Sequence, residues 1–221
     1  MLGTLGGGCV PLKIVTIAVF EKMAEREDRR KANARNVEAT YEKPNHLKLI
    51  REAKKRNLAK LTIRSCDDFT KLAKPLAELT KLKELNLQRN KITDLSPLVG
   101  LKNLQELNLS DNIFTDLSPL EGLTNLKELD LSRNNISDLS PLEGLSNLQE
   151  LNLSANTFTD LSSLEGLTNL KELDLSRNNI TDLSPLEGLT NLQTLRIYGI
   201  LIPEEQIAML KKALPDCSVR W

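Results

Sequence analysis

Leucine recurs along most of the chain at positions that repeat every 22 residues. Written in rows of 22 from Leu79, five rows run in register, and the second reads LKNLQELNLSDNIFTDLSPLEG, residues 101–122. A sixth row begins in register at Leu189 and then departs. Within each row a short stretch alternates apolar and polar residues, as at Leu85 and Leu87 with their polar neighbours. Because side chains alternate along a strand, the pattern predicts one short strand per row, with its leucines on one face.

The second half of each row predicts a short helical turn. Its Ser-Pro-Leu-Glu-Gly segment, residues 118–122 in one row, combines serine as a good N-cap, proline at the first helical position and glycine at the end of the turn. We expect one tight turn per row. One row cannot bury its leucines alone, so the rows must stack, with their strands paired in parallel around a continuous core.

Two further columns are interpreted as structural. Asparagine follows each strand where the chain turns inward, and a buried amide there can satisfy backbone groups that have no partner in the sheet. An apolar residue follows two positions later and is assigned to the core. These columns are Asn90, Asn112, Asn134, Asn156 and Asn178, and Ile92, Phe114, Ile136, Phe158 and Ile180.

Each row contains the motif LxxLxLxxN, as in Leu82, Leu85, Leu87 and Asn90. The chain therefore resembles the leucine-rich-repeat family, in the 22-residue class of the internalins and the type-1 phosphatase regulatory subunit, over about residues 58–221. The resemblance implies an α/β fold, a right-handed solenoid with a parallel concave sheet and short convex helical turns. It also implies protein ligands, but transfers no individual contact residue.

The ends of the array predict caps. We divide the chain into a flexible or charged helical N-terminal segment (1–43), an N-terminal cap helix (44–57), the repeats (58–200) and a C-terminal cap (201–221). Cys66 takes the asparagine place in the first, slightly longer row, and we assign it a structural role. The C-terminal cap is expected to be a helix from Pro203 through Leu214, followed by a strand at 217–221. Such lids cover exposed core and strand edges.

A longer period of 44 residues is also present. Rows 123–144 and 167–188 differ only at Ser137 and Thr181. Rows 101–122 and 145–166 differ at four places: Lys102/Ser146, Asp111/Ala155, Ile113/Thr157 and Pro119/Ser163. A double unit has been copied, by duplication or by design.

Composition argues against catalysis. The sequence holds one histidine and three cysteines, without a CxxC pair, and it offers no glycine-rich phosphate loop, metal-ligand cluster or nucleophile–base pair. We therefore expect no enzyme activity, no cofactor and no metal. The longest apolar stretch, Ile14 to Phe20, is too short to span a membrane. Unpaired cysteines favour a reducing, cytoplasmic location, although a secreted or surface form stays open.

Charge is distributed unevenly along the chain. Residues 1–78 carry 17 Lys/Arg against 10 Asp/Glu, whereas residues 79–200 carry 10 against 17. The acidic repeats would repel phosphate, so nucleic acid is not an expected partner. The basic residues of the N-terminal cap include Lys48, Arg51 and Lys60. They could dock on an acidic neighbour, even a second copy head to tail, which predicts salt-sensitive self-association.

The candidate partner-binding residues are the polar positions of the predicted sheet face. Five glutamates would stack in neighbouring strands, which is mildly destabilising, and Lys83, Lys127 and Lys171 are expected to offset them. The last row departs from the consensus at Arg196 and Tyr198. The full set is Glu84, Glu106, Glu128, Glu150, Glu172, Asp130, Asp174, Arg133, Arg177, Arg196 and Tyr198.

The leading hypothesis is a non-catalytic protein-binding module that recognises a basic or mixed-charge partner through the concave face. Three alternatives remain at this point. The face could be the soluble surface of a repeat consensus, the array could serve as a structural or surface-contact scaffold, or the chain could be the recognition half of a longer enzyme.

Overall fold

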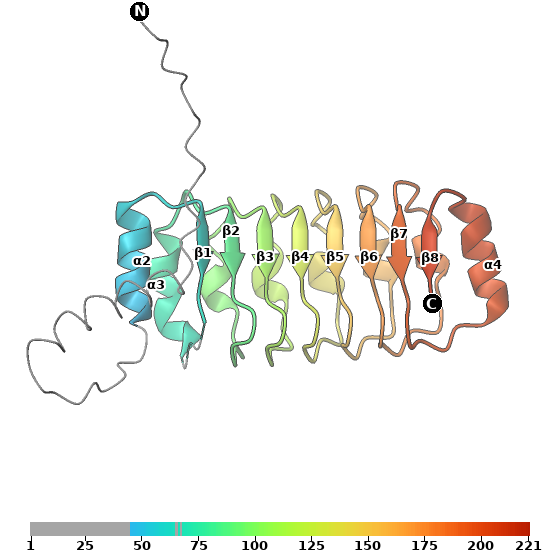
Figure 1. The fold of residues 1–221 in the computed structure, drawn as a ribbon, viewed down its shortest axis with the longest axis horizontal. Helices are drawn as coiled ribbons and strands as arrows, with labels where there is room; N and C mark the ends of the chain where they lie inside the picture. The colour runs from blue at the N-terminus through green and yellow to red at the C-terminus, as the bar shows by residue number, and fades with distance from the viewer. Residues whose placement is uncertain (1–44, 65, 67) are drawn as a thin grey trace, which may run out of the picture.

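The computed structural model describes residues 45–64, 66 and 68–221. It contains one parallel sheet whose eight strands follow chain order (Figure 1). The predicted segment 1–43 lies outside the described residues. The strands are β1 (Lys60–Thr62), β2 (Glu84–Asn86), β3 (Glu106–Asn108), β4 (Glu128–Asp130), β5 (Glu150–Asn152), β6 (Glu172–Asp174), β7 (Thr194–Arg196) and β8 (Ser218–Arg220).

The sheet register follows the row alignment without a slip. Leu85 of β2 pairs with Leu107 of β3, and Leu129 of β4 pairs with Leu151 of β5. A shift of one residue would turn every leucine to the polar face. The hydrophobic period therefore determines both the strand pairing and which side chains become neighbours, and the predicted parallel sheet is confirmed.

The core is a single cluster that runs the length of the array. Leu109, Leu131 and Leu153 are fully buried, and the apolar column from Ile92 to Ile180 is at most 2% exposed. Cys66 is buried, and its backbone N–H donates to the Asn90 side-chain oxygen at 2.9 Å. The structural roles predicted for the apolar column and for Cys66 are therefore both confirmed.

The asparagine column bonds one row to the next. Asn156 Nδ2 donates to the carbonyl of Leu153 in its own row at 3.0 Å and to that of Leu131 in the preceding row at 3.0 Å. Its Oδ1 accepts from the Ile136 N–H at 3.1 Å. Backbone groups that the short strands leave without a sheet partner are satisfied in this way.

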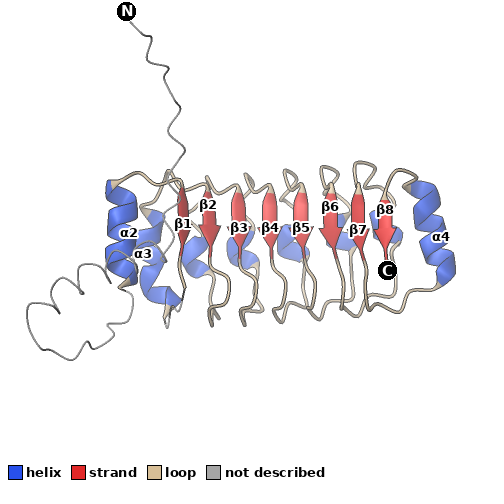
Figure 2. Ribbon diagram, in the orientation of Figure 1, coloured by secondary structure: helices blue, strands red, loops and turns tan. Residues whose placement is uncertain are grey.

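A single turn of 3-10 helix lies opposite the sheet in each regular row (Figure 2). These turns are η2 (Ser96–Leu98), η3 (Ser118–Leu120), η4 (Ser140–Leu142), η5 (Ser162–Leu164) and η6 (Ser184–Leu186). The first row is longer and carries η1 (Phe69–Leu72) followed by α3 (Ala73–Ala77). The expected tight turns are therefore present.

The details of these turns correct the sequence prediction. In η3 the N-cap is Leu117 and serine is the first helical residue, so the prediction was wrong by one position. The carboxylate two residues earlier supplies the cap: Asp116 accepts from the Ser118 N–H at 2.8 Å. The row glycines do not adopt positive φ; among described glycines that conformation occurs at Gly199 (φ 68°). A positive φ is therefore not the reason for glycine at the end of these turns.

Both caps are present. Helix α2 (His46–Lys55) starts at Asn45, whose side chain accepts from the Lys48 N–H at 3.0 Å, and it buries Ile50 and Ala53 in the core. Helix α4 (Glu204–Ala213) starts after Pro203, buries Leu210, and is followed by β8. Helices α2 and α4 lie beyond the two ends of the sheet (Figure 1). The helical N-terminal cap and the helix–strand C-terminal cap are confirmed.

Candidate partner-binding face

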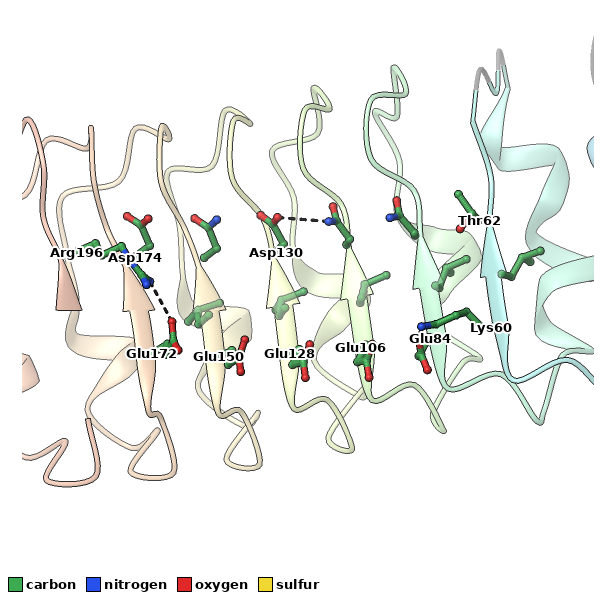
Figure 3. Close-up of a pocket in the computed structure, with 18 residues that line it drawn as sticks. Lys60, Thr62, Glu84, Glu106, Glu128, Asp130, Glu150, Glu172, Asp174 and Arg196 are labelled. Atoms are coloured by element: carbon green, nitrogen blue, oxygen red, sulfur yellow. Dashed lines mark hydrogen bonds and ion pairs between the residues drawn. The ribbon is translucent and has the colours of Figure 1, made fainter. Parts of the chain in front are cut away.

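The polar face of the sheet is hollowed. One open groove is lined by residues of strands β1 to β7, so the face is concave along most of the array. Two rows of side chains cross it (Figure 3). One is the glutamate column (Glu84, Glu106, Glu128, Glu150 and Glu172), and the other is the Asx column (Asn86, Asn108, Asp130, Asn152 and Asp174). The alternation along each three-residue strand places both columns here while the leucine between them points inward.

The glutamates of the column are direct neighbours across the sheet. Glu106 pairs in register with Glu84 on one side and with Glu128 on the other, and the same holds down to Glu172. Parallel strands lie about 4.8 Å apart, so five like charges are stacked at close range. The arrangement opposes folding rather than supporting it.

Cations close the two ends of the column. Lys60 of β1 forms an ion pair with Glu84, and Arg196 Nη1 of β7 lies 3.1 Å from Glu172 Oε2 (Figure 3). Within the described part of the chain, the three middle glutamates, Glu106, Glu128 and Glu150, have no ion-pair partner within 4 Å. The unbalanced negative charge is therefore concentrated at the centre of the groove.

The pKa of Glu128 reflects this position. Partial burial raises it above the ordinary value of 4.5, and the neighbouring Glu106 and Glu150 carboxylates raise it further. The more distant Lys60 ammonium opposes the shift. The ionised form of Glu128 is thus held at a cost that an approaching cation would relieve.

The lysines next to the column do not neutralise it. Lys171 Nζ donates to Gln149 Oε1 at 3.1 Å, and among the described residues neither Lys83 nor Lys127 forms an ion pair with a glutamate of the column. The expectation that they offset the glutamates was wrong, because they precede the outward glutamate by one residue and do not share its face.

The Asx column is partly occupied by the fold. Asp130 Oδ1 accepts from the Ser132 N–H at 3.0 Å, and its Oδ2 accepts from Asn108 Nδ2 at 3.4 Å. Asp174 Oδ1 accepts in the same way from the Ser176 N–H at 2.9 Å. These side chains shape the turn after the strand and also line the groove.

The predicted arginines lie beyond the strand ends, outside the groove lining. They belong to the post-strand column (Arg89, Asp111, Arg133, Ala155 and Arg177), whose members all have left-handed φ of 54–57°. Asp111 lies between two of them, with its Oδ2 3.5 Å from Arg89 Nε and its Oδ1 3.9 Å from Arg133 Nε. Arg133 and Arg177 are exposed.

At the C-terminal end, Tyr198 follows β7 and is 46% exposed. Its backbone N–H donates to Ser176 Oγ at 3.1 Å, and its carbonyl accepts from the Arg177 N–H. Trp221 lies under Lys211 of α4, with the Lys211 Nζ 4.0 Å from the ring centroid. The structure therefore brings together the predicted carboxylates and Arg196 in the groove and leaves Arg133, Arg177 and Tyr198 outside its lining.

Sequence reasoning missed Lys60 as a groove residue. On sequence alone Lys60 is assigned to the basic cap, whereas it belongs to β1 and pairs in register with Glu84. The signal was available, because aligning Leu61 with Leu85 places Lys60 in the glutamate column. Thr62, Asn86, Asn108 and Asn152 also line the groove, together with leucines of the strands.

The described residues carry no cluster of three or more His, Cys, Asp or Glu side chains arranged to hold a metal ion. In the same part of the chain, no helix has the length and apolar character needed to cross a bilayer. The groove is open and charged, which suits contact with an extended surface or segment.

A family profile described as Leucine Rich repeats (2 copies) matches residues 80–122, 124–166 and 168–212, more than half of the chain. The chain belongs to the leucine-rich-repeat family. A comparison with curated protein sequences finds no match.

Solved leucine-rich-repeat structures resemble this solenoid. Internalin C2 of Listeria monocytogenes is 32% identical with a TM-score of 0.69, and the match covers 78% of this chain and 80% of that one. An internalin of the same organism, InlF, is 32% identical with a TM-score of 0.67, over 76% of this chain and 49% of that one. A leucine-rich-repeat protein of Leptospira interrogans is 28% identical with a TM-score of 0.57, over 74% and 46%. The chain thus spans about half the length of InlF.

The expected resemblance to internalins is confirmed. Leucine-rich-repeat domains of this type are generally non-catalytic, and the family is consistent with protein partners.

Proposed function

We propose that this chain is a non-catalytic protein-binding module that recognises a basic protein segment in the groove of its sheet. The observation that carries the proposal is the unneutralised centre of the glutamate column: both end carboxylates have cations, while Glu106, Glu128 and Glu150 have none among the described residues. Like charges in register destabilise a sheet. A partner that places Lys or Arg side chains over these carboxylates would remove that cost and gain charge-assisted hydrogen bonds.

The shape of the face supports the same partner. The groove runs across the strands from β1 to β7, and its carboxylates recur once per strand. The strand spacing of about 4.8 Å is of the same order as the distance between same-side residues of a partner segment, which is about 5.4 Å for one turn of a helix and about 6.8 Å for every second residue of an extended segment. Ion pairs formed in an open groove are screened by salt, so binding should weaken as ionic strength rises.

The test is affinity capture from a lysate of the source cell at low and high salt, with three baits. They are the wild-type chain, the groove variant Glu106→Lys/Glu128→Lys/Glu150→Lys, and the convex variant Glu121→Lys/Glu143→Lys/Glu165→Lys. The convex glutamates belong to η3, η4 and η5 as C-caps and are exposed. Both variants change the net charge equally and in corresponding rows.

We expect a protein that the wild type and the convex variant capture, and that high salt and the groove variant lose. A partner that the groove variant retains would move the binding site away from the groove. Equal loss in both variants would show a general charge effect. Capture of no protein by any bait would favour the scaffold alternative.

A further inference from the structure

Two rows of the array share one backbone conformation but differ in charge just after the strand. Asp111 and Ala155 occupy the same place in the copied double unit, and both have φ of 55°. The Asp111 N–H donates to the Ser132 carbonyl at 3.0 Å, and the Ala155 N–H donates to the Ser176 carbonyl at 2.8 Å. The backbone is therefore alike, and only the carboxylate is missing at Ala155.

The carboxylate at Asp111 shows what that place can hold. Its two oxygens reach the Nε atoms of Arg89 and Arg133, in the rows before and after it, at 3.5 and 3.9 Å. One acidic group at this register position therefore spans two arginines. The equivalent position 44 residues further on is Ala155, which carries only a methyl group. It is flanked in the same way by Arg133 and Arg177.

Arg177 is left without a carboxylate by this exchange. Among the residues that the structure describes, its guanidinium forms no ion pair within 4 Å. Arg133 has one distant partner, Asp111. Two exposed guanidinium groups thus border a place from which the acidic group is absent.

The alanine brings no gain to the fold itself. A left-handed φ is unfavourable for alanine, whereas aspartate tolerates it better because its side chain bonds locally. Aspartate at this position would also supply an ion pair to each neighbouring arginine. The residue at 155 is therefore the poorer choice for stability, and its effect is to leave Arg133 and Arg177 available.

We propose that Arg133 and Arg177, on either side of Ala155, bind a single Asp or Glu side chain of the protein partner. This proposal rests on the proposed function, and it adds that the basic segment in the groove carries one acidic residue. Guanidinium groups match carboxylates in geometry and form their strongest hydrogen bonds with them. Ala155 lies five positions after Glu150 along the chain, so the acidic residue would bind within about 18 Å of the glutamate column.

The test uses short synthetic peptides of alternating lysine and alanine, in which a single glutamate is moved from position to position. Each peptide has a partner with glutamine in place of the glutamate. Affinities are measured by calorimetry or fluorescence anisotropy for the wild type, Ala155→Asp, Ala155→Asn and the groove variant. Asparagine tolerates positive φ as aspartate does but carries no charge, so Ala155→Asn is the matched control.

The sign of the glutamate effect decides the question. Glutamate lowers the positive charge of the peptide, so contact with the glutamate column alone makes every glutamate peptide bind more weakly than its glutamine partner. We expect at least one position at which the wild type and Ala155→Asn bind the glutamate peptide about three- to tenfold more tightly than its glutamine partner. In Ala155→Asp the new carboxylate lies between Arg133 and Arg177. This variant should therefore bind the glutamine peptide more tightly than the corresponding glutamate peptide.

Two failures can be told apart. Peptides that bind the wild type better than the groove variant, with no glutamate position preferred, would overturn the carboxylate site alone. A preference that survives in Ala155→Asp would overturn it as well. Peptides that bind neither protein, or both equally, would overturn the proposed function and this inference with it.

Discussion

Individual side chains hold the rows together through backbone bonds that the short strands cannot make. Each strand is three residues long, so much of the backbone of a row lies outside the sheet. Side chains supply hydrogen bonds to that backbone, from the asparagine column and from the aspartates that precede the 3-10 turns. Asn156 bonds two rows, and Asp116 holds the start of η3. The asparagine role was predictable, since a buried amide needs backbone partners. The aspartate role was not predicted, because serine is itself a favoured N-cap residue and the pattern therefore did not require a carboxylate two residues earlier.

Backbone strain in the post-strand column gives a prediction at this scale. Ala155→Gly should raise the free energy of unfolding by about 0.5–1 kcal/mol, because glycine accepts the left-handed φ of 55° without steric cost. Denaturant unfolding followed by circular dichroism measures the change. The control is Ala73→Gly, where φ is −52° and glycine should lower stability by a similar amount. Equal signs for the two variants would contradict the role of φ.

The 22-residue period determines where the strands and turns lie, and charged side chains at the same row position interact between neighbouring rows. The glutamate column exists because register pairing puts the same row position of every strand side by side. Its unfavourable electrostatics are shared by neighbours rather than belonging to one residue. The sequence predicted that the five carboxylates would stack, but it assigned their counter-ions to the wrong lysines.

The raised pKa of Glu128 predicts a pH dependence of stability. A carboxyl whose folded pKa lies above its unfolded value destabilises the fold when ionised, so stability should rise as the pH falls from 7 toward the ordinary value of 4.5. Glu128→Gln should stabilise the protein at pH 7 by about 0.2–1 kcal/mol and flatten that rise. Urea unfolding at pH 7 and pH 5 provides the measurement.

The exposed convex residue Glu143 is the control for this change. Glu143→Gln should leave the pH profile unaltered, since Glu143 is exposed on the convex side and lies outside the strands that pair the groove glutamates in register. An opposite trend is expected at lower pH, because hydrogen bonds from Ser118 and Ser162 hold the pKa values of Asp116 and Asp160 below 3.8. Stability from these groups is lost as the pH falls through their lowered pKa values. A wild type that loses stability steadily from pH 7 to 5 would contradict the account.

At the scale of the whole molecule, the solenoid is a stack in which each row touches only its neighbours. Stability is then close to a sum over rows and the interfaces between them, and the ends depend on their caps. The cap helices were predictable from their proline and asparagine starts and from the need to cover a terminal row. Salt-sensitive self-association through the basic cap stays a prediction; Lys54 and Arg56 of that cap already pair with Glu78 and Glu52.

Disruption of the N-terminal cap should act locally. Ile50 is 1% exposed, and Ile50→Asp should destabilise the cap by about 2–5 kcal/mol through a lost apolar contact and a buried charge. Hydrogen exchange should then accelerate in β1 and β2 while β5 changes little. Arg51→Asp, at the neighbouring exposed position, should leave both regions unaffected. Uniform acceleration across all strands would show that the array unfolds as one unit.

The sequence by itself determined the stack. A period of 22 residues with leucine, asparagine and serine-proline positions dictates a strand, a turn inward and a helical turn in every row. Because neighbouring rows pair in register, it also dictates which residues become neighbours across the sheet.

Only the tertiary structure decided how those neighbours share their charge. The pairing of Lys60 with Glu84 and of Arg196 with Glu172, the unpaired centre between them and the place at Ala155 depend on distances of a few ångströms between side chains of different rows. Periodicity specifies the order of residues along the stack. It cannot specify which nearby cation reaches a carboxylate, because that choice depends on side-chain direction and on the curvature of the assembled sheet.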